Sequence, residues 1–100
     1  MAGYGKPVVV GWYRPEDWAR IREISEDRAN LPESFEMWRR RAERNLAKFA
    51  IAGAVPDKII VDPDALLTWA AVRNVKIDQK TRGLFAVEIA KREYKAERAN

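Results

Sequence analysis

The sequence predicts a small α+β domain built from two strand–helix–helix units, with a two-stranded sheet covered by helices. In each unit a short apolar run leads into a helix that a proline begins, first over residues 8–18 and again over residues 59–66. The two copies align 48 residues apart, so that apolar positions of their helices coincide. The aligned pairs are Pro15 with Pro63, Trp18 with Leu66, Ile21 with Trp69, and Ile24 with Val72.

The first strand is expected over residues 7–13, an apolar run of strand length that is rich in β-branched valine. Pro15 has the fixed φ of a first helical turn, so a helix is expected from there to about Asp27. Apolar residues follow at spacings of three, which predicts one helical face packed against the core.

The second helix is the most strongly indicated and is expected over residues 32–52. Asn30 is a candidate N-cap with Glu33 completing a capping box, and Ser34 is an alternative cap. Gly53 stands where a helix often ends in a left-handed conformation. The apolar stripe of this helix, expected to face the core, consists of Phe35, Trp38, Ala42, Leu46 and Phe49.

The second unit begins with a strand expected over residues 58–61. Asp62 can cap the next helix and Pro63 can open it, and the helix is expected to continue to about Arg73. Asn74 is then a plausible left-handed stop.

The last helix is expected from a cap at Asp78 to about Ala96, and Gly83 weakens it by about 1 kcal/mol relative to alanine. Residues 1–6 and 96–100 lack apolar anchors, so we expect both ends to be flexible.

The composition limits both the size and the chemistry of the protein. A chain of 100 residues, 47% of them apolar, has the length of one domain spanning residues 1–100. The absence of Cys and His excludes disulfides, thiolate zinc sites and imidazole bases, so we expect no enzymatic activity, no metal and no cofactor. No signal-peptide pattern and no apolar run of about 20 residues is present, which predicts a cytoplasmic protein outside the membrane.

Tryptophan is more simply explained by core packing than by stacking on nucleobases or carbohydrate. Trp18, Trp38 and Trp69 lie on apolar helical stripes, as buried aromatic residues do. Trp12 ends the first strand, and the pattern leaves its direction open.

The small sheet predicts an interaction function. Two short strands are marginal by themselves, and an exposed edge invites pairing with another chain. We therefore expect a homodimer whose sheets join or whose apolar faces pack, and a non-enzymatic module that binds a protein partner or itself.

Two basic clusters are the candidate binding residues. In the helix over residues 32–52, Arg40, Arg41 and Arg44, continued by Lys48, form an outward stripe. The stripe is either a solvated face, with Glu36 placed to pair with Arg40, or a contact for an acidic partner or a phosphate backbone.

The alternative function is nucleic-acid binding by the C-terminal half. The last two helices have the dimensions of a helix–turn–helix, and Arg73, Lys76, Lys80 and Arg82 could meet phosphates there. Lys80 and Arg82, in the first turn of the last helix, are unfavourably placed relative to the helix dipole. An unfavourable placement without evident compensation can indicate a functional site. The competing interpretation is a simple helical hairpin in which Asp78 offsets these cations.

The stretches over residues 12–18 and 26–35 resemble those of a family of small bacterial proteins of unknown function, with a similarity extending over nearly the whole chain. This resemblance implies a cytoplasmic bacterial origin. It implies no activity and carries over no site residue.

Overall fold

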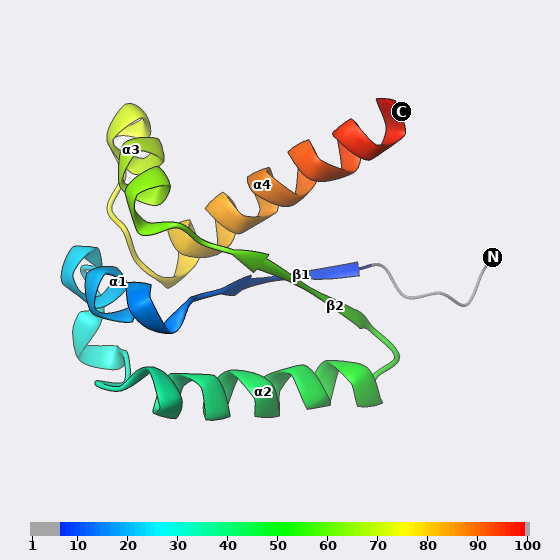
Figure 1. Cartoon of the computed structure of the whole chain (residues 1–100), viewed down its shortest axis with the longest axis horizontal. Helices are drawn as coiled ribbons and strands as arrows, with labels where there is room; N and C mark the ends of the chain where they lie inside the picture. Colours follow the sequence, from blue (N-terminus) through cyan, green and yellow to red (C-terminus); the bar gives the residue numbers. More distant parts are fainter. Residues whose placement is uncertain (1–6, 100) are drawn as a thin grey trace.

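The computed structural model describes residues 7–99 and confirms the α+β class (Figure 1). The predicted flexible segment over residues 1–6 lies outside the described residues, as does Asn100. The elements are, in order, strand β1 (Pro7–Trp12), 3-10 turn η1 (Pro15–Asp17), helix α1 (Trp18–Ile24), 3-10 turn η2 (Arg28–Asn30), helix α2 (Phe35–Ile51), strand β2 (Val55–Ile60), helix α3 (Pro63–Arg73) and helix α4 (Gln79–Ala99).

The two strands form a parallel pair whose register reproduces the sequence repeat. Pro7 lies beside Val55 and Trp12 beside Ile60, so each residue of β1 is paired with the residue 48 positions later. Beyond the strand ends, the Val61 N–H donates to the Trp12 carbonyl at 2.9 Å. The repeated positions of the sequence are therefore neighbours in space.

The sheet separates two helical layers. α4 packs on one face, and α2 lies along the other (Figure 1). Gly11 faces α4, and a Cβ at this position would lie 3.7 Å from the Ala86 Cβ, so the glycine permits the close approach of the helix. Trp12 faces α2, where its ring centre lies 4.9 Å from that of Trp38.

The core lies between the sheet, α4 and the two helices α1 and α3 that follow the strands. Trp18 and Trp69 are buried, while Trp38 is half-buried among aromatic neighbours. The Trp18 indole N–H donates to the Pro32 carbonyl at 3.1 Å. The apolar residues buried in this core are Tyr13, Trp18, Ile21, Ile59, Val61, Leu66, Trp69, Ala70, Ile77, Phe85, Ala86 and Ala90.

Several predicted helix signals are confirmed. The Asp62 carboxylate accepts from the Ala65 N–H at 2.9 Å and caps α3. Asn74 ends that helix with φ 53°, and Gly53 has φ 84° after α2. The Asp78 carboxylate accepts from the Thr81 N–H at 3.0 Å at the start of α4.

The predicted first helix over residues 15–27 is wrong as one continuous element. Residues 15–24 form η1 followed by α1, and Ser25 has extended backbone angles that end α1 at Ile24. The Ser25 hydroxyl donates to the Ile21 carbonyl at 2.6 Å, so the side chain bonds back to the last helical turn.

Other boundaries also differ from those predicted. Ser34, rather than Asn30, caps α2, because its hydroxyl accepts from the Met37 N–H at 3.1 Å. β2 begins at Val55, three residues earlier than expected, since its pairing with β1 continues through Pro56. α4 continues to Ala99, so residues 96–99, predicted to be flexible, belong to a helix.

No helix within residues 7–99 combines the length and the apolar character that crossing a membrane requires.

Candidate functional site

The first predicted binding cluster lies on the outward side of α2. Arg40, Arg41 and Arg44 are exposed, as is Lys48, which continues the stripe. In the described part of the chain none of these four side chains forms an ion pair. We call these four residues the basic face of α2.

The acidic residues of α2 are paired with a different arginine. Arg39 bonds to Glu36 at 2.7 Å and to Glu43 at 3.0 Å. The expected pair between Glu36 and Arg40 is therefore replaced by the pair with Arg39. The hydrogen bond from Arg39 lowers the pKa of Glu36. As a consequence, Glu36 and Glu43 form no ion pair with the basic face.

The second predicted cluster does not form one surface. Arg73, at the end of α3, bonds to Glu88 of α4 at 3.1 Å and lies over the Trp69 ring, 4.5 Å from its centre. Glu88 also accepts from the Trp69 indole, and that hydrogen bond, together with the charge of Arg73, lowers the Glu88 pKa. These contacts join α3 to α4. Lys76 and Lys80 are exposed.

Arg82 is the main correction to the predicted site. Its residue is 5% exposed, and its guanidinium bonds to both carboxylate oxygens of Asp27, at 2.7 and 3.0 Å. It also donates to the Ser25 hydroxyl at 2.9 Å and to the Tyr13 hydroxyl at 3.1 Å. We call this group of four residues the Arg82 network. Arg82 thus points inward, and its donors are used within the fold rather than offered to a phosphate.

The electrostatics of the Arg82 network favour the ionised carboxylate. Hydrogen bonds from Arg82 hold the pKa of Asp27 below its ordinary value. Burial raises the pKa of the Tyr13 hydroxyl, with Arg82 acting in the opposite direction. The only signal in the sequence was the unfavourable position of Arg82 in the first turn of a helix, and nothing there identified a partner 55 residues away.

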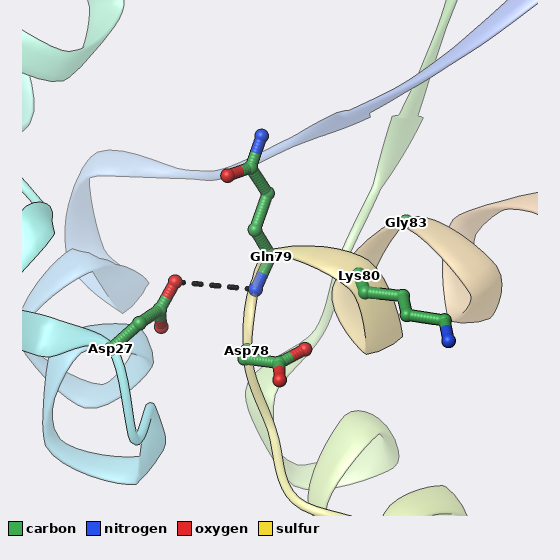
Figure 2. A pocket seen from close by; sticks show the side chains of 5 residues that line it. All are labelled: Asp27, Asp78, Gln79, Lys80 and Gly83. Atoms are coloured by element: carbon green, nitrogen blue, oxygen red, sulfur yellow. Dashed lines mark hydrogen bonds between the residues drawn. The ribbon is translucent and has the colours of Figure 1, made fainter.

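An open depression of about 620 Å³ lies at the N-terminus of α4 (Figure 2). It is lined by Asp27, Asp78, Gln79, Lys80 and Gly83. The Gln79 N–H donates to Asp27 at 3.2 Å, and the Lys80 side chain extends away from Asp27 (Figure 2). The carboxylates of Asp27 and Asp78 thus accept hydrogen bonds from backbone N–H groups that a bound anion would need at this helix end. Among residues 7–99, no group of three or more His, Cys, Asp or Glu side chains could hold a metal ion.

The outer edge of β1 is a further surface, which the sequence analysis anticipated only as an exposed edge. The sheet of the described chain contains two strands, and the backbone of residues 8–11 has no hydrogen-bond partner there outside β2. β1 carries no charged residue and its proline, Pro7, is its first residue, whereas β2 contains Pro56, Asp57 and Lys58. Proline and charge both oppose pairing at a strand edge, so β1 has the less protected edge.

Comparisons of the chain with known protein families, with curated proteins and with solved structures found no match. The resemblance to small bacterial proteins stays a prediction, and any function has to be argued from these surfaces.

Proposed function

We propose that this chain is a non-enzymatic protein-interaction module that forms a homodimer through the outer edge of β1. The observation that carries the proposal is that the outer edge of β1 is unpaired within residues 7–99 and that β1 has an uncharged, β-branched sequence. Such an edge is a ready template for another strand, and isolated two-stranded sheets are marginal in water.

The backbone groups available for pairing follow from the register. The Trp12 carbonyl accepts from Val61, so the backbone of Trp12 points toward β2. Because peptide groups alternate in direction along a strand, Val8 and Val10 also bond toward β2, while Val9 and Gly11 direct their N–H and C=O groups outward. These outward groups are the donors and acceptors that a partner strand would use.

A second copy of the chain is the partner that fits this edge best. Two β1 strands related by a two-fold axis pair antiparallel, so the same uncharged segment supplies both sides of the contact. The result is a sheet of four strands with a central pair of β1 strands, and the β2 strands, with Pro56 and Lys58, form its outer edges. Half-exposed valines of β1 would lose further contact with water in this arrangement.

The non-enzymatic part of the proposal is supported by the side chains at hand. The sequence contains neither Cys nor His. The carboxylates around the depression at the start of α4 bond to backbone N–H groups or to Arg82. The helix–turn–helix alternative has less support, because Arg73 and Arg82, two of its four cations, bond within the fold.

Light scattering coupled to size-exclusion chromatography tests the dimer. We expect twice the chain mass for the native protein and a single chain mass for Val8→Lys, because lysine on an edge strand opposes pairing and two-fold symmetry brings two such charges into one small contact. The matched control is Val55→Lys on β2, where valine is 59% exposed, and this variant should stay dimeric. A monomeric native protein at high concentration, or equal dissociation by both variants, would contradict the proposal.

A further inference from the structure

We infer that the basic face of α2 is a second interaction surface and that its partner is the phosphate backbone of double-stranded DNA. This inference goes beyond the proposed dimer and does not depend on it, because the basic face lies on a helix and the dimer contact on a strand edge.

The spacing of the basic face concentrates its charge. Arg40, Arg44 and Lys48 follow one another at intervals of four residues, so they form a single row along the helix. The row is about 12 Å long at 1.5 Å per residue, and Arg41 lies beside it. Like charges at this spacing destabilise a helix slightly, and in the described residues no carboxylate offsets them within ion-pair distance. A polyanionic partner would offset that repulsion.

The position of α2 leaves this row accessible. α2 forms the outer layer on its side of the sheet (Figure 1), and none of its residues is buried. Phe35 and Trp38 of its apolar stripe pack against the core, where Trp38 contacts Trp12, while Phe49, which was also predicted to face the core, is exposed. The outward side therefore offers a helix of about 25 Å with nothing packed over it in the described structure.

Duplex DNA fits these features better than other polyanions do. Single-stranded nucleic acid is bound by stacking bases on aromatic side chains, and the basic face contains no aromatic residue. Helices that lie on an anionic membrane insert an apolar face, whereas Phe35 and Trp38 of the apolar stripe of α2 pack against the core. Phosphate contacts by Arg and Lys supply most of the affinity in nonspecific duplex binding, and a helix about 10 to 12 Å wide fits a B-form major groove of about 12 Å.

Fluorescence anisotropy of the full chain with a labelled random-sequence DNA duplex tests the inference. If four cations neutralise four phosphates, the slope of log K against log salt is about −3.6, and affinity falls on the order of 100-fold between about 50 and 200 mM salt. The double variant Arg40→Gln, Arg44→Gln should reduce that slope by about 2 units. Glutamine has a helix propensity close to that of arginine, so α2 should stay folded, which circular dichroism checks.

Two control pairs locate the site. Lys91→Gln with Lys95→Gln removes the same charge from exposed positions of α4 and should leave the slope nearly unchanged. Lys76→Gln with Lys80→Gln should also leave the salt slope nearly unchanged. The inference is overturned by absence of binding at about 50 mM salt, by equal losses in the α2 and α4 pairs, or by a larger loss in the pair at residues 76 and 80. It is also overturned if the protein sediments with phosphatidylserine vesicles but leaves the duplex free.

Discussion

Arg82 shows how one side chain can join segments that are far apart in the sequence. It connects α4 to Tyr13 at the end of β1 and to Ser25 and Asp27 in the segment after α1. A buried cation is costly unless its charge and its donors are satisfied, and each nitrogen of this guanidinium has a partner. Removing either member of the pair therefore leaves a charge without compensation.

We expect Arg82→Ala to lower the free energy of unfolding by about 3 kcal/mol, near the lower end for a broken buried pair because Asp27 keeps some contact with water. Arg82→Lys should lower the free energy of unfolding by a smaller amount, since lysine keeps the charge but not the bidentate geometry. Urea unfolding followed by tryptophan fluorescence, at one fixed protein concentration, measures both. Lys80→Ala is the matched control on the same turn and should change stability by less than about 0.5 kcal/mol. A similarly small change for Arg82→Ala would contradict the role of the Arg82 network.

The start of α2 shows how packing chooses between two plausible caps. Asn30 and Ser34 are both good N-cap residues, and local sequence does not separate them. In the structure Asn30 belongs to η2, while Pro32 is buried and accepts from Trp18. The segment between Asn30 and Ser34 is thus fixed by the burial of Pro32, and the helix begins only after Ser34.

Ser34→Ala should lower the free energy of unfolding by about 1 kcal/mol, because the Met37 N–H loses its acceptor. Asn30→Ala, the matched control, removes a side chain that does not cap α2 and should cost less than about 0.5 kcal/mol. Thermal unfolding of the two variants measures the difference. A larger loss of unfolding free energy for Asn30→Ala than for Ser34→Ala would contradict this role of Ser34 and support Asn30 as the cap.

In the molecule as a whole, polar contacts join the two strand–helix–helix units. Arg14 bonds to Asp62 at 3.0 Å, and these two residues are again 48 positions apart. The Glu26 N–H donates to the Ile77 carbonyl at 2.8 Å, and Asp27 bonds to both Arg82 and Gln79. Asp27 is therefore a titratable link between the two units.

This link should make stability depend on pH. The pKa of Asp27 in the folded state is lowered from its ordinary value of 3.8, chiefly by hydrogen bonds from Arg82. Its contribution is therefore present above that ordinary value and is lost as pH falls through the lowered pKa. We expect the free energy of unfolding to fall with acid more steeply in the native protein than in Asp27→Asn, as measured by urea unfolding from pH 7 downward. Glu36, Asp78 and Glu88, whose pKa values are also lowered, should leave a residual slope in Asp27→Asn, and identical slopes in the two proteins would exclude the role of Asp27.

Local sequence was sufficient for the order of the strands and α-helices, for both ends of α3 and for the start of α4. Asp62, Asn74 and Asp78 act within a few residues of their own positions, so their roles follow from short-range hydrogen bonding and backbone preference. The repeat at 48 residues matches the register found in the sheet, because equivalent positions of two similar units meet when their strands pair in parallel.

Tertiary structure alone decided the parallel orientation of the strands and the burial of Arg82. Each of these depends on which distant segments meet. Asp27 lies 55 residues from Arg82, and its carboxylate turns a predicted surface cation into an internal contact. By contrast, Arg39 pairs with Glu36 and Glu43 inside α2 itself, and within residues 7–99 the other cations of that helix form no ion pair. Spacing along one chain can place a charge on a helix face and beside a near neighbour, but only packing brings that charge to a partner in a distant segment, as it does for Arg82 and Asp27.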